Sequence, residues 1–110
     1  TDEVISIEKI LKEKFPHLSI CRSHANFLEV MHKSATKGNA VRFLEDYFHV
    51  KMEECVAFGD NFNDLDMLES VGLGVAMGNA PDEIKQSANR VTASHNDDGI
   101  ALILNEIFPE

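Results

Sequence analysis

Hydrophobic residues change their spacing near residue 16. Over residues 2–14 apolar side chains recur every three or four positions with charged ones opposite, which predicts an amphipathic helix. Phe15-Pro16 ends that pattern, because a residue before proline disfavours the helical conformation. Residues 18–23 and 27–33 are short runs rich in apolar residues, separated by His24-Ala25-Asn26, and they predict a β-hairpin.

Beyond a small polar break at residues 34–36, helical and strand patterns alternate. The expected elements are a helix at 37–48, a strand at 55–58, a helix at 64–70, a strand at 74–77, a helix at 81–88, a third strand at 90–92, and a last helix that begins at Asp97-Asp98 as its cap and runs to 108. Such alternation predicts an α/β fold with a parallel sheet, right-handed crossovers and flanking helices. Ligands bind at the carboxyl ends of strands in such sheets, so residues 59–64, 78–80 and 93–98 are where chemistry is expected.

Composition narrows the class of protein. The 110 residues are 44% hydrophobic and 26% charged, which excludes collagen, long coiled coils and wholesale disorder. No apolar run approaches the roughly 20 residues that span a bilayer, and no signal segment opens the chain. The net charge of -9 argues against a nucleic-acid partner but allows small phosphorylated ligands and metal ions. Cys21 and Cys55 lie in apolar runs, which predicts buried free thiols and a reducing cytoplasmic location.

The acidic loop at residues 59–64 carries the strongest chemical signal. Asp60 directly follows a strand, which we expect to be a central strand of the parallel sheet, and Asp64 lies four residues on at a helix start. Two converging carboxylates repel each other unless a cation or a donor lies between them, and hard oxygen ligands at this spacing suit Mg²⁺. The alternative is an N-cap at Asp64 after a simple turn at Gly59-Asp60. Asp66 is expected to point to solvent or to favour the start of its own helix.

Lys37 and Gly38 conflict with the helix that they open. A cation in the first turn opposes the helix dipole, and glycine lowers helix propensity by about 1 kcal/mol. Local conflicts of this kind cluster at functional sites. A lysine beside a helix N-terminus is a plausible phosphate ligand, and the alternative is a solvated surface lysine.

These motifs together resemble the carboxyl-terminal half of a haloacid dehalogenase superfamily phosphatase, most closely its Cof-type branch. The resemblance covers nearly the whole chain, and the lysine motif together with the acidic loop is fairly specific. The matching segments are Thr36-Lys37-Gly38, the Gly-Asp-x-x-Asn-Asp-x-x-Met-Leu motif at 59–68, Met77 to Ala80, Asp98-Gly99, and a hairpin with Ser23 and Phe27-Leu28-Glu29 that resembles the end of the cap domain.

The resemblance implies a role for each matching residue. Asp60 would bind Mg²⁺ directly, and Asp64 would support the metal directly or through water. Asn63 would contact phosphate or a metal-bound water, and Lys37 would neutralise the phosphoryl group and the nucleophile. Asn79 is a candidate phosphate or substrate ligand, with helix capping as the alternative. The implied reaction is Mg²⁺-dependent hydrolysis of a small phosphomonoester, such as a sugar phosphate, through an aspartyl-phosphate intermediate.

The chain departs from the family pattern in one respect. Such enzymes use an Asp-x-Asp nucleophile motif after an apolar strand and a Ser or Thr after another strand, and the sequence has no match to them; Asp64-Leu65-Asp66 has the spacing only. We therefore expect a fragment that is inactive alone. Residues 35–110 would form a partial Rossmann-like α/β half of the core, and residues 1–34 would be a helix and hairpin that remain from an α/β cap. It should self-associate or bind the missing amino-terminal half. The alternative is a stand-alone, non-catalytic binding module of the same fold.

The histidines offer little further chemistry. No pair has the spacing of a zinc site. His24 is expected at the tip of the hairpin, where it either contacts a substrate or lies in a solvated turn.

Overall fold

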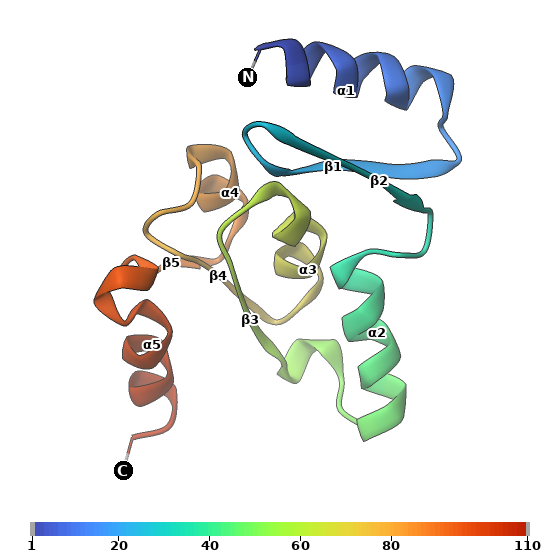
Figure 1. The fold of residues 1–110 in the computed structure, drawn as a ribbon. Helices are drawn as coiled ribbons and strands as arrows, with labels where there is room; N and C mark the ends of the chain where they lie inside the picture. Colours follow the sequence, from blue (N-terminus) through green and yellow to red (C-terminus); the bar gives the residue numbers. More distant parts are fainter. Residues whose placement is uncertain (1, 110) are drawn as a thin grey trace.

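The computed structural model describes residues 2–109 and contains two sheets, an antiparallel hairpin and a parallel three-stranded sheet (Figure 1). The helices and strands, in chain order, are α1 (Asp2–Lys14), β1 (Leu18–His24), β2 (Phe27–His32), α2 (Lys37–Phe48), β3 (Val56–Gly59), α3 (Leu65–Ser70), β4 (Leu73–Ala76), α4 (Asp82–Ser87), β5 (Arg90–Val91) and α5 (Gly99–Ile107). Short 3₁₀ turns lie at Met52–Glu54, Phe62–Asp64 and His95–Asp97. The predicted α/β fold is confirmed, and each predicted helix and strand appears within a few residues of its expected bounds.

The first sheet lies between α1 and the remainder of the molecule (Figure 1). Its strands pair in an antiparallel register that sets Ile20 opposite Val30. Successive side chains of a strand point to opposite faces, so Ile20 and its neighbour Cys21 face different ways. Ile20 is buried, whereas Cys21 lines a pocket on the side of α2. The hairpin therefore presents one face to the helix before it and the other to the loops that follow.

The parallel sheet has the order β3-β4-β5. Strand β4 is buried along Gly74, Val75 and Ala76, as expected for a strand covered on both faces. Leu68 of α3 and Ile84 of α4 complete the core against this sheet, and both are fully buried. The core therefore lies directly beneath the carboxyl ends of β3 and β4.

Strand β3 lies at the edge of this sheet, because no other strand in residues 2–109 pairs with its second side. The expectation that Asp60 follows a central strand is therefore wrong for this chain, although Asp60 does follow the end of β3. Helix α2, beside β3, also leaves its aromatic side chains uncovered: Phe43, Tyr47 and Phe48 are 69%, 68% and 62% exposed. One edge and one helix face of the parallel layer thus lack a covering partner within the described residues.

Two local expectations need correction. The last helix begins after Asp98, which has a left-handed backbone (φ 56°) and no side-chain capping bond, so capping by Asp97-Asp98 is wrong. Ser94 instead caps the 3₁₀ turn that precedes this helix, where its hydroxyl accepts from the backbone N–H of Asn96. The two cysteines are free, as predicted, but half-buried rather than buried. Within residues 2–109, helices are too short and too polar to cross a membrane.

Candidate functional site

The loop after β3 is folded around the carboxylate of Asp64, which is 4% exposed. Its Oδ2 accepts hydrogen bonds from the backbone N–H groups of Asp60, at 2.9 Å, and Asn61, at 3.2 Å. The turn at Phe62–Asp64 is closed in return by Asn61, whose side chain accepts from the N–H of Phe62. The buried carboxylate of Asp64 therefore stabilises the loop by accepting from its backbone N–H groups. The simple N-cap alternative is wrong, because the Asp64 side chain makes no capping bond to α3.

Gly59 makes room for this arrangement. A Cβ at residue 59 would lie 2.5 Å from the Cβ of Asp64 and 2.9 Å from its Cγ, a separation that real side chains do not adopt. The Gly-Asp pair at the end of β3 thus has a physical reason, because only glycine lets residue 64 fold back over the strand end.

Lys37 reaches the same carboxylate from another element. Its ammonium forms an ion pair and hydrogen bond with Asp64 Oδ1. Lys37 begins α2, where the Thr36 side chain caps the helix by accepting from the N–H of Asn39. The ammonium is half-exposed and Asp64 is buried, so the carboxylate fixes the cation while leaving part of it open to a ligand. The structure therefore brings together the lysine and the acidic loop, two motifs separated by more than twenty residues.

Asp60 follows the same strand but has a different partner. Its Oδ2 accepts a hydrogen bond from Asn79 Nδ2 at 3.1 Å, and Asn79 Oδ1 accepts from the backbone N–H of His95 at 3.0 Å. Asn79 thus links the loops that follow β3, β4 and β5. The helix-capping alternative for Asn79 is wrong, because α4 begins after Pro81 without a side-chain cap.

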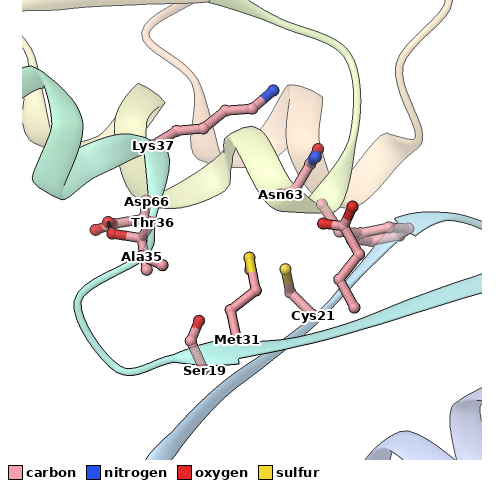
Figure 2. A pocket seen from close by; sticks show the side chains of 10 residues that line it. Ser19, Cys21, Met31, Ala35, Thr36, Lys37, Asn63 and Asp66 are labelled. Carbon is pink, nitrogen blue, oxygen red and sulfur yellow. Dashed lines mark hydrogen bonds between the residues drawn. The ribbon is translucent and has the colours of Figure 1, made fainter.

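Two pockets flank the loop. The first, of about 290 Å³, lies between the hairpin and the start of α2 (Figure 2). Its lining includes Lys37 and Asn63 on one side and Cys21 and Met31 on the other, and Figure 2 shows both sulfur atoms pointing into the pocket. Burial, and then the charge of the neighbouring Glu29, raises the pKa of the Cys21 thiol, so the pocket presents a thiol and not a thiolate at neutral pH.

The second pocket, of about 370 Å³, lies on the other side of Phe62. Asp60 and Asn79 line it together with two histidines, His24 from the tip of the hairpin and His95 from the loop after β5. Lys37 and Asp60 therefore line separate pockets that share Phe62, while both contact Asp64. His24 thus lies at the tip of the hairpin, as predicted, and lines this pocket.

Arg22 contributes a contact that the sequence analysis missed. Its guanidinium lies 3.9 Å from the centroid of the Phe62 ring, a cation–π distance. Its Nε lies 2.8 Å from Glu8 Oε2, so the two side chains form an ion pair. The Nε–H group does not point at this oxygen well enough to count as a hydrogen bond. The hairpin and α1 therefore contact the acidic loop through one arginine. The pairing of the two strands shifts register between Arg22 and His24, which the sequence did not predict.

Asp66 lies in the first turn of α3 and its side chain is 46% exposed, as the sequence led us to expect. The sequence did not predict a further contact, in which the Asp66 carboxylate accepts a hydrogen bond from the Thr36 hydroxyl at 2.9 Å, at the start of α2. The sequence held one signal for this contact, the glycine in the first turn of α2.

The carboxylates of Asp60 and Asp64 fit part of a Mg²⁺ site. Mg²⁺ typically takes one or two protein carboxylates and fills its other positions with water and phosphate oxygens. Within the described residues, no three carboxylate, histidine or cysteine side chains converge as a complete metal site. Both oxygens of Asp64 already have protein partners, whereas Asp60 is partly exposed and faces a pocket. A metal at this loop would therefore use Asp60 directly and Asp64 as support.

Comparison with known proteins shows the family of this chain. A family model described as haloacid dehalogenase-like hydrolase matches residues 1–104. A Haemophilus influenzae protein named "Putative phosphatase" is 80% identical over 109 residues, which are 99% of this chain and 42% of that protein. The Bacillus subtilis 5-amino-6-(5-phospho-D-ribitylamino)uracil phosphatase YitU is 46% identical over 81 residues, 74% of this chain and 30% of that protein.

Solved structures show the same likeness. The subclass IIB sugar phosphatase BT4131 superposes with a TM-score of 0.87 at 34% identity, over 94% of this chain and 40% of its own. SMU.1108c from Streptococcus mutans gives a TM-score of 0.91 at 26% identity, over 99% of this chain and 42% of its own. The chain thus spans about two fifths of the length of these relatives. From the lysine motif, the acidic loop and the extent of these matches, we conclude that the chain belongs to the haloacid dehalogenase-like hydrolase family.

Proposed function

We propose that this chain supplies the lysine and acidic-loop motifs of a Mg²⁺-dependent phosphatase of the Cof type, which hydrolyses a small phosphomonoester. The observation that carries the proposal is the pairing of Lys37 with Asp64, inside the loop that also bears Asp60 and Asn63. The naming of relatives as phosphatases, one of them a sugar phosphatase, supports a sugar phosphate or a similar metabolite as the substrate.

Each proposed residue acts on the phosphoryl group through charge or hydrogen bonding. Lys37 presents an ammonium that neutralises negative charge on the phosphoryl oxygens as it develops in the transition state. Asn63 lines the same pocket and can donate its amide N–H to one of these oxygens. Asn79 either contacts the substrate from the second pocket or acts through Asp60, to which its amide is bonded. Bound Mg²⁺ would supply a further positive charge at the carboxylates of Asp60 and Asp64.

The nucleophile of this proposal lies outside the chain. An aspartate of an Asp-x-Asp motif in an amino-terminal half would attack phosphorus and form an aspartyl-phosphate, which water then hydrolyses. The same proposal assigns residues 1–34 to the end of a cap and residues 35–110 to half of the catalytic core. Within a reducing cytoplasm, the two free thiols would stay unpaired.

The missing half has a docking surface in this proposal. An apolar groove of about 680 Å³ runs along β3 and α2, lined by residues that include Val41, Leu44, Phe48, Val56 and Phe58. Beside it, the free edge of β3 offers unpaired backbone groups to another strand. An apolar strand fits both features. A second copy of this chain is the competing occupant.

The experiment that tests the function adds the missing half in trans. We expect the isolated chain to show no turnover of p-nitrophenyl phosphate with Mg²⁺, because it contributes no nucleophile, and to self-associate through the open edge. Turnover should appear when an amino-terminal half containing Asp-x-Asp is added. Light scattering across a dilution series should show species larger than the 12.3 kDa monomer.

Three results would count against this prediction. A compact monomer at every concentration would remove the self-association claim. If the isolated chain shows turnover and the Lys37→Ala variant does not, the nucleophile lies within this chain. Absence of turnover after complementation, together with tight binding of a phosphorylated ligand, would favour the stand-alone binding module.

Mg²⁺ should bind the isolated chain only weakly, with a dissociation constant on the order of a millimolar, because Mg²⁺ demands near-ideal octahedral geometry and the other ligands come from the missing half. Titration calorimetry measures this directly, with Asp60→Ala as the variant and Asp46→Ala, on the exposed part of α2, as its control. A micromolar site that Asp60→Ala abolishes would contradict the prediction and show that the residues of this chain suffice.

A further inference from the structure

The carboxylate of Asp66 occupies the space where residue 38 would carry a side chain. A Cβ built on Gly38 would lie 2.0 Å from Asp66 Oδ2 and 2.4 Å from its Cγ. The three nearest atoms to that position all belong to the Asp66 side chain. Gly38 therefore leaves room for the Asp66 carboxylate. This explains why glycine, which is unfavourable in a helix, is found in the first turn of α2.

Thr36 bonds to the same carboxylate from the other side of Lys37. Its hydroxyl donates to Asp66 Oδ2 at 2.9 Å and accepts from the backbone N–H of Asn39 at 3.1 Å. One hydroxyl thus caps α2 and ties it to α3. Figure 2 shows Thr36 and Asp66 together at the start of α2, with the Lys37 side chain extending away from them toward the side of Asn63.

Electrostatics favour the carboxylate at this place. The carboxylate of Asp66, a residue of α3, lies against the amino-terminal end of α2. Helix α2 has 12 residues, and its dipole stabilises a negative charge at that end. Arg42, one turn into α2, has its Nη2 3.6 Å from Asp66 Oδ1 and donates to Ser70 Oγ at 2.8 Å. Ser70 Oγ in turn donates to the backbone carbonyl of Asp66 at 2.6 Å. Helix α2 is therefore joined to α3 by side chains that converge on one residue.

We propose that Asp66 is a positioning residue for Lys37. Its carboxylate contacts the residues immediately before and after the lysine, Thr36 by a hydrogen bond and Gly38 by close packing. Because Asp66 and the acidic loop belong to one continuous segment that leads into α3, the carboxylate fixes the start of α2 relative to Asp64. The Lys37 side chain is thereby held where its ammonium can pair with Asp64. The catalytic consequence rests on the proposed function, whereas the anchor does not.

A double-mutant cycle in urea unfolding of this chain tests the anchor. We expect Gly38→Ala to lower the unfolding midpoint, because its methyl group displaces the Asp66 carboxylate and breaks the hydrogen bond with Thr36. In the Asp66→Ala background the same change should leave the midpoint unchanged or raise it, since alanine forms helices better than glycine. Equal shifts in both backgrounds would overturn the proposal.

Gly72 provides a matched control for this cycle. A Cβ at Gly72 would lie 1.9 Å from the backbone carbonyl oxygen of Glu53, which no change at residue 66 can relieve. Gly72→Ala should therefore lower the midpoint by the same amount with and without Asp66. Rescue of Gly72→Ala by Asp66→Ala would show a general effect on stability and would overturn the specific contact.

Turnover by the chain assembled with its amino-terminal half tests the positioning role. Asp66→Ala should lower kcat about tenfold with KM changed less than twofold, because misplacing a catalytic group by about 1 Å costs this much or more. Asp66→Asn should recover part of the loss, since its carbonyl oxygen still accepts from Thr36. In the Lys37→Ala background Asp66→Ala should have no further effect.

The outcomes separate this proposal from the proposed function. Independent, multiplicative effects of Asp66→Ala and Lys37→Ala on kcat would overturn the positioning role, as would an unchanged kcat in Asp66→Ala. If the assembled protein hydrolyses no phosphomonoester at all, the proposed function fails. The urea cycle still decides whether Asp66 anchors the start of α2.

Discussion

Lys37→Ala is expected to lower kcat of the assembled phosphatase by about 10²- to 10³-fold, the loss typical of removing one group that stabilises transition-state charge. The reason lies in the geometry of the ammonium. It is held by the buried carboxylate of Asp64, yet half of the side chain remains exposed in a pocket shared with Asn63. The cation is therefore in place before the substrate arrives, and its charge costs no reorganisation during the reaction.

The measurement is steady-state hydrolysis of p-nitrophenyl phosphate with saturating Mg²⁺. Lys51→Ala is the control, because Lys51 is exposed, follows the other end of α2 and precedes β3, whereas the acidic loop follows that strand. We expect this control to retain the activity of the unchanged protein. Turnover by Lys37→Ala within twofold of that activity would rule out the role of the lysine, while equal losses in both variants would point to a failure of assembly.

Asp64→Ala is expected to destabilise the chain by about 2–3 kcal/mol, a large share of the stability of a small domain. The substitution leaves the N–H groups of Asp60 and Asn61 without their acceptor and Lys37 without its partner. The lysine regains water because it is half-exposed, so its contribution is smaller than that of a fully buried pair. Most of the loss comes from the two backbone donors inside the loop.

Urea unfolding compares this variant with Asp64→Asn and Asp46→Ala. The asparagine keeps one oxygen that can accept from the loop, so its loss should be about half as large. Asp46, exposed on α2, should change the stability by less than about 0.5 kcal/mol when replaced. A loss below about 1 kcal/mol in Asp64→Ala would show that the loop does not depend on the buried carboxylate.

The helices and strands of this protein were largely predictable from periodicity. The spacing of apolar residues predicted α1 and α2 with their observed bounds, because the face that packs inward repeats with the helical period. The uncharged runs near residues 56 and 74 predicted β3 and β4, since a strand covered on both faces shows no alternation. Boundaries near caps were less certain, and Asp98 failed as a cap because its backbone is left-handed.

The candidate residues were also found from the sequence, but not their partners. The spacing of Asp60 and Asp64 pointed to a site, yet it could not show that one carboxylate is buried under Gly59 and the other exposed beside Asn79. Nor did it show that Phe62 divides the surroundings into two pockets, one with Lys37 and one with Asp60. Hydrogen bonds between loops depend on how the strands are placed side by side, which local patterns do not specify.

The sequence by itself determined the elements, the α/β class and the residues that carry the chemistry, because these depend on periodicity and on side-chain type within short segments. Only the tertiary structure decided that Asp66 contacts Thr36 and Gly38, that Arg22 lies over Phe62, and that no strand within residues 2–109 pairs with the second side of β3. Each of these depends on a contact between segments distant in the chain. The free energy of such a contact comes from the packing and charge of side chains that belong to different segments, so the sequence of one segment does not specify it.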